Sequence, residues 1–460
     1  MAALWELAAV ELQRLLQAGE VSAVEVVRAH LERIDAVNPE LNAIVTLVPE
    51  QALKEAEQTD RAIVRGSLHG LPIAIKDLVD TAGIRTTYGS PIYRDHVPAA
   101  DAALVRRLRA AGAIVVGKTN TPEFGAGSQT FNAVFGVTRN PYDPTRTPGG
   151  SSGGAAVAVA TGMLPFADGS DLGGSLRNPA SFCNVVGLRP SPGRVPDPDR
   201  DDLWEPLSVL GPIARTVRDL ALLLGALVAP EPGTPLALGA WEPPDLDADP
   251  GRPRIAWSRD LGGLPIDPAV TAALDAARPG LEAAADVVDA EPDLADADEA
   301  FHVLRALGFA RKLAGEVRAH RDLVKDTVVW NVEEGLALDA ERIARAQAIR
   351  SEVFTRTAAF LRDYDALALP ASLVPPFPVE VDWVREIAGV RLDSYLDWMR
   401  ACTRISVTAH PAISVPFGFT PDGLPVGLQL VGRYGDEAGL LRVAAVVEAA
   451  AGASARRPAI

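Results

Sequence analysis

Residues that ligate metals or form disulfides are scarce in this sequence. Cys183 and Cys402 are its only cysteines and its six histidines are scattered, so no spacing resembles a metal site or a disulfide framework. The longest weakly polar stretch, residues 155–167, is interrupted by Gly and Pro and is too short to cross a bilayer. The N-terminus also lacks the basic region and small-residue cleavage site of a signal peptide. We therefore expect a soluble cytoplasmic protein with no metal site and no membrane segment.

Positive charge is also in short supply. The sequence has 44 Lys and Arg residues against 60 Asp and Glu residues, a formal net charge of −16. A surface that binds phosphate backbones needs the opposite balance, so we expect no nucleic-acid partner. Much of the acid lies in residues 245–250 and 289–300, which we interpret as solvated linkers.

Strand and helix patterns alternate over the first 190 residues, which predicts an α/β fold. Residues 1–60 are predicted to be helical, with Ser22 and Glu25 forming a capping box. Further along, the apolar spacing predicts a turn and strand in 68–80, a helix in 102–112 and a short buried strand in 113–120.

The second half of the chain has fewer sharp patterns. A helix is predicted in 217–228, and residues 266–363 are predicted to be mainly helical. Residues 364–370 predict a core strand, and two apolar runs at 410–419 and 424–432 predict a hairpin. No repeat or flexible linker divides the chain, so we predict one domain spanning residues 1–460.

Two short motifs match known patterns without the required context. Residues 112–119 fit the written P-loop pattern, but their middle is a β-branched strand and no helix follows Lys118. Residues 149–153 fit the nucleophile elbow of α/β-hydrolases, but the segment before them is turn-forming rather than a central strand. Because histidines occur downstream, the elbow interpretation is weak rather than excluded.

Residues 149–182 carry the strongest chemical signal. Two Gly/Ser clusters flank a predicted small-residue helix (155–160) and a predicted short strand (164–167). The turn from Asp171 to Ser175 is built of small residues, so its backbone N–H groups can converge on a developing negative oxygen. Ser175 at its end is a candidate nucleophile, provided that a neighbouring base takes its proton.

Lys76 is the candidate base. Apolar residues surround it in LPIAIKDLVD, and burial would lower the pKa of its amine toward neutrality. From spacing alone a surface lysine, or one paired with Asp77, is equally compatible with the pattern.

These residues resemble the amidase signature family. The long Gly/Ser-rich signature of that family is matched from Pro148 through Phe182. Five further segments carry the resemblance, so that about half of the chain is covered: 70–77, 117–124, 183–196, 211–224 and 422–433.

The resemblance implies roles for individual residues. The catalytic lysine of the family falls on Lys76, its bridging serine on Ser151 and its nucleophile on Ser175. The oxyanion N–H groups fall on Leu172, Gly173, Gly174 and Ser175, and the supporting positions on Ser152, Asp171 and Arg177. Substrate contacts are expected at Gly125, Ser128 and Gln129. In the family the bridging serine follows a cis peptide bond, which would be Gly150–Ser151 here.

The fold and reaction that the resemblance implies are specific. The fold is a large, mixed, twisted central sheet with helices on both faces. Its signature core would occupy about 65–225 and 403–450, and a variable helical region of about 235–400 would shape the substrate pocket. The reaction is hydrolysis of amide bonds of small acyl or aryl amides, with esters and carbamates (urethanes) as further substrates, through an acyl-enzyme on Ser175. No cofactor is implied, and a homodimer is the family-level expectation.

The sequence also departs from the family pattern. Many members carry Asn and Gly where this chain has Ser406 and Ala409. Residues 190–202 differ from the glutaminase subunit of the tRNA-dependent amidotransferase complex, which makes that function the alternative rather than the first expectation. The apolar stretch 124–136 favours an uncharged or aromatic substrate, although at least two of Phe124, Phe131 and Phe135 are expected in the core.

Overall fold

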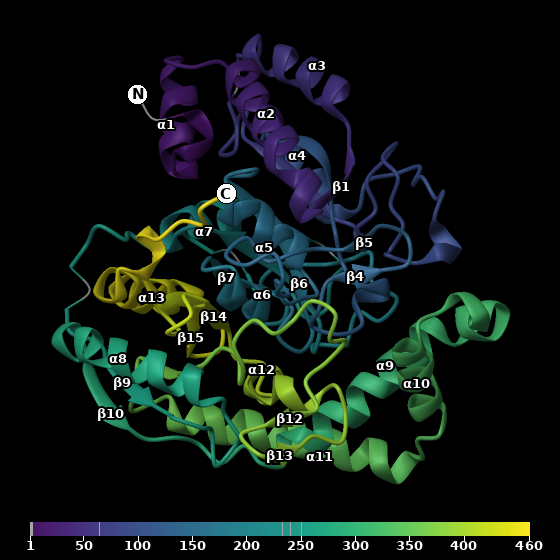
Figure 1. Ribbon diagram of the computed structural model, residues 1–460, viewed down its shortest axis with the longest axis vertical. Coiled ribbons are helices and arrows are strands. Elements are labelled where there is room, and N and C mark those ends of the chain that lie inside the picture. Colours follow the sequence, from purple (N-terminus) through teal and green to yellow (C-terminus); the bar gives the residue numbers. More distant parts are fainter. Residues whose placement is uncertain (1–2, 64, 232, 240, 250) are drawn as a thin grey trace.

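A mixed eight-stranded sheet runs through the middle of the molecule (Figure 1). The computed structural model describes residues 3–63, 65–231, 233–239, 241–249 and 251–460. Across the sheet the strands follow the order β10 (Asp286–Asp289), β9 (Arg254–Trp257), β11 (Ala366–Pro370), β15 (Pro425–Val431), β14 (Ala412–Phe419), β7 (Val186–Arg189), β8 (Val209–Ala214) and β6 (Phe166–Asp171). The first three are parallel to one another, and all later neighbours are antiparallel.

A smaller sheet lies beside the β6 edge. It has the order β1 (Ile44–Leu47), β3 (Ile114–Thr119) and β2 (Pro72–Lys76), with β2 and β3 parallel. The strand β2 ends at Lys76, whose backbone N–H donates to the Asp168 carboxylate of β6 at 3.0 Å. Two short two-stranded hairpins complete the strands: β4 (Phe131–Asn132) with β5 (Gly136–Val137), and β12 (Glu386–Ile387) with β13 (Val390–Arg391).

Thirteen α-helices occur in the described part of the chain. In the first half these are α1 (Ala9–Ala18), α2 (Ala23–Leu41), α3 (Pro49–Asp60), α4 (Ala103–Ala110), α5 (Gly153–Ala160), α6 (Arg177–Phe182) and α7 (Val217–Leu227). In the second half they are α8 (Pro268–Ala284), α9 (Ala297–His320), α10 (Asp326–Leu336), α11 (Ala340–Phe360), α12 (Arg400–Val407) and α13 (Glu437–Ala451). No helix among the described residues has both the length and the apolar character needed to cross a membrane.

Helices cover both faces of the large sheet, which explains why its central strands β14 and β15 are nearly continuous apolar runs. Along β15, Val426, Leu428 and Leu430 join one buried cluster, whereas Val431 joins another. Successive strand residues point to opposite faces, so each face has its own apolar layer. The first layer contains α7, α8 and α13, and the second contains α9, α11 and α12. The predicted fold class is therefore confirmed.

The helix α5 is buried on all sides because its residues are small. A side chain at Gly154 would place its Cβ 2.4 Å from the Asn120 N and 2.5 Å from the Ala43 O. This close approach lets α5 pack directly on the backbone at the end of β3. The packing fixes the N-terminus of α5, where Ser151 and Ser152 lie.

The helices α9 and α10 pack on each other and extend to the right in Figure 1. An apolar cluster joins them to Ala126, and the Tyr93 hydroxyl donates to Glu316 of α9 at 2.8 Å. The N–H of Lys325, the residue before α10, donates to the Glu123 carboxylate at 2.7 Å. Thus a helical pair from the second half of the chain is anchored on a loop from the first half.

Several predicted elements are confirmed: the Ser22–Glu25 capping box, the strand in 68–80, the helix in 102–112, the strand in 113–120, the helix in 217–228, the strand in 364–370 and the C-terminal hairpin. Three predictions are wrong in part. Residues 44–47 form an edge strand within the predicted helical region 1–60, because they pair with β3. Residues 286–289 form β10 within the predicted helical region, because they pair with β9. The strand predicted at 164–167 begins at Phe166 and continues to Asp171, held by pairing with β8.

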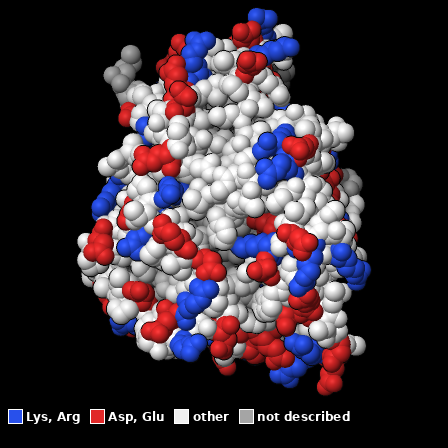
Figure 2. Space-filling model, turned by 45° about the vertical axis from the view of Figure 1, so that its right-hand side comes forward, with Lys and Arg blue, Asp and Glu red and all other residues white. Residues whose placement is uncertain are grey.

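Charged side chains of both signs are mixed over the face shown in Figure 2, around a broad area that carries neither sign. On this face the net negative charge is therefore not gathered into a single patch.

Candidate active site

The amine of Lys76 lies in a cluster of three serine hydroxyls. Its Nζ donates to Ser151 Oγ at 2.7 Å, to Ser152 Oγ at 2.9 Å and to Ser170 Oγ at 3.0 Å. The lysine side chain is fully buried at the end of β2. Asp77 does not pair with it, because that carboxylate accepts from the hydroxyl and the N–H of Thr87. Of the alternatives that the sequence leaves open, a surface lysine and an Asp77 ion pair are therefore both wrong.

Burial of Lys76 lowers the pKa of its amine to about 7, and the charges of Asp168 and Asp171 only partly oppose the effect. Desolvation disfavours the ammonium form of a buried lysine. At neutral pH a substantial fraction of Lys76 is therefore neutral and able to accept a proton.

The loop that carries Ser151 is fixed by a neighbouring loop. The Gly150–Ser151 peptide bond is cis, as the family resemblance implies. The Ser128 hydroxyl donates to the Gly150 carbonyl at 2.6 Å, and the Thr130 hydroxyl donates to the Gly149 carbonyl at 2.9 Å. Ser151 is thus held from the backbone side while its hydroxyl faces Lys76.

The turn before Ser175 is organised around the carboxylate of Asp171. This carboxylate accepts from the Gly174 N–H at 2.9 Å, from the Leu176 N–H at 3.1 Å and from Arg177 at 2.8 and 3.0 Å. Burial alone would raise the pKa of Asp171, but the charge and hydrogen bonds of Arg177, together with Arg189, hold it well below its usual range. Asp171 is therefore ionised, and it fixes the turn.

The hydrogen bonds of Asp171 also determine which of the four expected oxyanion N–H groups are already in use. The Gly174 N–H is occupied by Asp171, whereas the N–H groups of Leu172, Gly173 and Ser175 donate to no described residue. A side chain at Gly173 would approach Phe301 Cζ to 2.6 Å, so a larger residue there would have to displace the Phe301 ring of α9. Three of the four expected N–H groups thus remain available to a ligand.

Ser175 is half-buried beside the Lys76 cluster. Its carbonyl accepts from the Ser152 N–H at 3.2 Å, which joins the two Gly/Ser loops through their backbones. Within the described part of the chain no hydrogen bond links the Ser151 and Ser175 hydroxyls. Hydrogen bonds between catalytic groups are often long without substrate and tighten when it binds. The structure therefore brings Lys76, Ser151 and Ser152 into direct contact and places Ser175 on the adjoining loop.

Arg177 connects this turn to the C-terminal half. Beyond Asp171, its guanidinium donates to the Cys402 carbonyl at 3.0 Å, to Gln429 Oε1 at 2.6 Å and to Ser406 Oγ at 2.8 Å. Ser406, one of the two departures from the family pattern, thus serves as an acceptor for Arg177. Ala409, the other departure, has φ of +59°, a left-handed conformation that glycine adopts without strain.

Two of the three predicted substrate contacts lie beside Ser151. Gly125 has φ of +71°, and a side chain there would place its Cβ 3.6 Å from Ser151 Oγ. Ser128 contacts the Ser151 loop through Gly150 but its hydroxyl is used in that contact. The Gln129 amide donates to the Val379 carbonyl at 2.9 Å, and its Oε1 is buried with no partner among the described residues. The role of these residues in binding substrate stays a prediction.

The three phenylalanines of this loop are all half-buried. Phe124 packs at the edge of the α9–α10 cluster. Phe131 has the Lys325 amine 4.2 Å from its ring centre, and Phe135 has the Arg85 guanidinium at 4.8 Å. The prediction that at least two of them belong to the core is therefore wrong, because two of the rings carry cations on their faces.

Sequence reasoning missed two groups at the lysine. Ser170 accepts from the Lys76 amine, and the Asp168 carboxylate accepts from the Lys76 backbone N–H. Both residues belong to β6, where residues two apart face the same side. Continuing the predicted strand from Ala167 through Asp171 would have placed both side chains toward Lys76.

The structure explains both short motifs that match known patterns: the P-loop pattern in residues 112–119 and the nucleophile-elbow pattern in residues 149–153. Lys118 is buried in β3, and its amine donates to Thr81 and Thr86 and to the Val79 carbonyl, which leaves it unsuited to bind a phosphate. The buried imidazole of His410 contacts the Thr408 carbonyl through Nδ1. The Ser151 hydroxyl contacts Lys76 rather than a histidine, so the nucleophile-elbow interpretation is wrong.

No group of three or more His, Cys, Asp or Glu side chains among the described residues could hold a metal ion.

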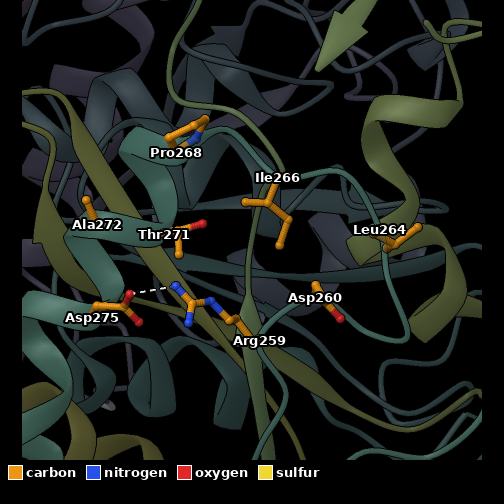
Figure 3. A pocket seen from close by; sticks show the side chains of 8 residues that line it. All are labelled: Arg259, Asp260, Leu264, Ile266, Pro268, Thr271, Ala272 and Asp275. Carbon is orange, nitrogen blue, oxygen red and sulfur yellow. Dashed lines mark hydrogen bonds and ion pairs between the residues drawn. The ribbon is translucent and has the colours of Figure 1, made fainter. Parts of the chain in front are cut away.

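A separate surface hollow of 470 Å³ lies between the end of β9 and the start of α8 (Figure 3). An ion pair between Arg259 and Asp275, 2.8 Å long, crosses it. Leu264, Ile266, Pro268 and Ala272 supply its apolar side chains. It shares no residue with the serine–lysine cluster.

Known proteins are similar to this chain over nearly its whole length. The family model described as Amidase matches residues 25–441. An acylamidase of Rhodococcus erythropolis is 36% identical over 98% of this chain and 97% of its own length. The A-type subunit of the glutamyl-tRNA(Gln) amidotransferase of Thermus thermophilus is 37% identical over 96% of each chain.

Solved structures of two hydrolases superpose on nearly the whole chain. The 6-aminohexanoate cyclic dimer hydrolase in complex with substrate superposes with a TM-score of 0.89 and 31% identity, covering 100% of this chain and 99% of the other. A bacterial aryl acylamidase of the amidase signature family superposes with a TM-score of 0.91 and 26% identity, covering 98% and 97%. The chain therefore belongs to the amidase signature family, and it is a hydrolase of carbon–nitrogen bonds other than peptide bonds.

Proposed function

We propose that this protein is a serine amidohydrolase that cleaves small acyl or aryl amides through a covalent acyl-enzyme on Ser175. The observation that carries the proposal is the 2.7 Å contact between the buried Lys76 amine and the Ser151 hydroxyl, next to the turn that ends in Ser175. The acylamidase and aryl acylamidase relatives support amides as the substrate class.

In the first half-reaction neutral Lys76 takes the proton of Ser151 while Ser151 takes the proton of Ser175. The Ser175 oxygen then bonds to the carbonyl carbon of the amide, and the carbonyl oxygen becomes an oxyanion. We assign the N–H groups of Leu172, Gly173 and Ser175 as its donors, and Gly174 as a residue that shapes the turn through Asp171. Donors fixed in this way stabilise the charge without reorganising during the reaction.

In the next steps the carbon–nitrogen bond breaks. Ser151 delivers its proton to the leaving nitrogen, takes the Lys76 proton in turn, and the acyl group remains on Ser175 as an ester. Water then attacks this ester with the same relay accepting its proton, which releases the acid and restores the Ser175 hydroxyl. Esters and carbamates also carry a carbonyl that Ser175 could attack, so we include both as further substrates.

The test is a panel of p-nitroanilide amides, p-nitrophenyl esters and aryl carbamates, compared by kcat/KM. Ser175→Ala and Lys76→Ala should each reduce amide turnover by several orders of magnitude. The double variant should be little worse than either single variant, because residues that act as a unit have non-additive effects. Near-normal amidase activity of Lys76→Ala across pH 6–9 would show that the assigned base is wrong.

A second candidate function is supported by the amidotransferase relatives. The Thermus thermophilus amidotransferase protein is 37% identical to this chain over nearly its whole length. In that role the protein would release ammonia from glutamine and need partner proteins. Glutaminase activity that appears only with copurified partners, with no activity on anilides by the chain alone, would favour this candidate over the first.

A further inference from the structure

The Lys325 amine, at the residue before α10, lies beside the loop that we expect to line the proposed active site. The Lys325 amine is 4.2 Å from the ring centre of Phe131 and 3.5 Å from the Ala126 carbonyl. A side chain at Gly127 would place its Cβ 3.9 Å from this amine. Arg305 is buried, and its charge is near enough to contribute to lowering the pKa of Lys325.

Among the described residues, neither Lys325 nor Arg305 has a carboxylate within salt-bridge distance of its charged group. The Glu123 carboxylate nearby accepts from the Ser90 hydroxyl and from the Lys325 backbone N–H rather than from its amine. Arg305 stacks on Phe309, with 4.2 Å to the ring centre, and donates to Asn331. The charges of Glu123 and Asp382 act on Lys325 only from beyond salt-bridge distance. A desolvated cation with no carboxylate in direct contact is costly, so an anion that reached the amine would be bound favourably.

The path from the Lys325 amine to the Ser151 hydroxyl of the proposed relay is short. The Gly125 position is in contact with Ser151, and the Gly127 position is in contact with the Lys325 amine. Two residues of extended chain span at most about 7 Å. A substrate with a few bonds between its amide and a second polar group can therefore reach both.

We propose that Lys325, backed by Arg305, forms a subsite for a carboxylate carried by the amide substrate at the end remote from the scissile bond. The inference rests on the proposed amidohydrolase function and narrows its substrates to acidic amides, such as those with a dicarboxylic acyl group or an aminobenzoate leaving group. The loop 124–136 supplies apolar contact, and Lys325, just before α10, supplies the charge, with Arg305 of α9 behind it.

The charge state of Lys325 suits this role. Burial lowers the pKa of Lys325 to about 8, with Glu123 and Asp382 opposing the shift and Arg305 adding to it. The amine is therefore mostly protonated at pH 7. A bound carboxylate would stabilise the protonated form further.

Pairs of substrates that differ in charge test the proposal. The first pair is glutaryl-p-nitroanilide and hexanoyl-p-nitroanilide, and the second is N-acetyl-4-aminobenzoate and N-acetyl-4-methylaniline. We expect the wild type to prefer the acidic member of at least one pair by tenfold or more in kcat/KM. Lys325→Met should lose at least a tenfold preference, mainly through KM, and Lys325→Arg should retain most of it.

Lys312→Met, which removes an exposed lysine of α9, is the matched control and should leave the preference unchanged. A wild type without preference for either acidic substrate would overturn the proposal, as would a Lys325→Met variant that loses activity equally on both members of each pair. The latter result would assign Lys325 a purely structural role in anchoring α10 to the loop. If the wild type turns over neutral amides normally, the proposed amidohydrolase function stands even when the carboxylate subsite is disproved. If no amide is turned over in a Ser175-dependent manner, both the amidohydrolase function and the subsite are disproved.

Discussion

The carboxylate of Asp168 accepts the backbone N–H of Lys76 at 3.0 Å, which places a buried acid directly beside the lysine that contacts Ser151. The second carboxylate oxygen has no hydrogen-bond partner among the described residues. Burial raises the pKa of Asp168 to about 6, with the Lys76 N–H and the charges of Lys118 and Lys76 opposing the shift. Asp168 is thus ionised above this pH and favours the protonated form of Lys76.

This relationship predicts how activity depends on pH. In the wild type, kcat/KM should rise with pH through about 7, because Lys76 must lose its proton to act as a base. Asp168→Asn removes the negative charge that favours the ammonium form, so the pKa of Lys76 should fall. We expect the acidic limb of the profile to move to lower pH by roughly one unit.

The pH profile of a p-nitroanilide substrate measures this shift. Asp95→Asn, at an exposed acidic residue, serves as the control and should leave the limb in place. An unchanged limb in Asp168→Asn, or one that moves to higher pH, would show that Asp168 does not set the protonation of the proposed base.

The Asp171–Arg177 pair should be essential for stability. Both side chains are fully buried and 2.8 Å apart, and Asp171→Asn would leave the Arg177 charge without its main partner. Removing one member of a buried ion pair typically lowers the free energy of unfolding by about 3–5 kcal/mol. Urea unfolding followed by circular dichroism measures the change.

The exposed Glu299–Arg345 pair provides the comparison for that measurement. Glu299→Gln should leave the urea midpoint essentially unchanged, because exposed ion pairs are screened by solvent. Equal midpoints for Asp171→Asn and Glu299→Gln would contradict the structural role of the buried pair.

Two glycine-to-alanine variants should have opposite effects. Gly154→Ala would force a methyl group to within 2.4 Å of the Asn120 backbone, and relief requires α5 to move. Overpacking of this kind lowers the free energy of unfolding by about 1–3 kcal/mol or more. Gly315 lies exposed in α9 with no neighbour within 4 Å, so Gly315→Ala should raise stability by up to about 1 kcal/mol.

Thermal denaturation of both glycine variants checks this prediction, with amide turnover as a second measurement. Displacement of α5 should also reduce turnover in Gly154→Ala, because Ser151 and Ser152 lie at its N-terminus. If Gly154→Ala were as stable and active as the wild type, the packing of α5 on β3 would not position the serines.

Hydrophobic patterns predict much of the fold because a strand that is buried on both faces of the sheet is a nearly continuous apolar run in the sequence. The apolar runs of β14 and β15 predicted their hairpin without any knowledge of their neighbours. The strand β6 was predicted too short because Gly169, Ser170 and Asp171 have low strand propensity and depend on pairing with β8. The edge strand β1 was missed because it is a short segment between two helices, and its pairing with β3 decides its conformation.

In the site, too, features that depend on neighbouring residues are predictable from the sequence, whereas contacts between distant segments are not. The turn from Asp171 to Ser175 is local, and its Gly/Ser pattern predicted it. The environment of Lys76 is not local, because Ser151 lies 75 residues further along the chain and sequence spacing left a surface lysine open. The Lys325 amine on Phe131 was not anticipated, since the contact depends on how α10 docks onto Glu123, 202 residues earlier.

The most direct test of the central claim is the mass of the protein after reaction with a fluorophosphonate probe, followed by peptide mapping of the modified residue. A single adduct on Ser175, absent from Ser175→Ala and formed much more slowly in Lys76→Ala, is the predicted result. An adduct on Ser151 or Ser152, or labelling of Ser175→Ala at the wild-type rate, would contradict the assignment of Ser175 as the nucleophile.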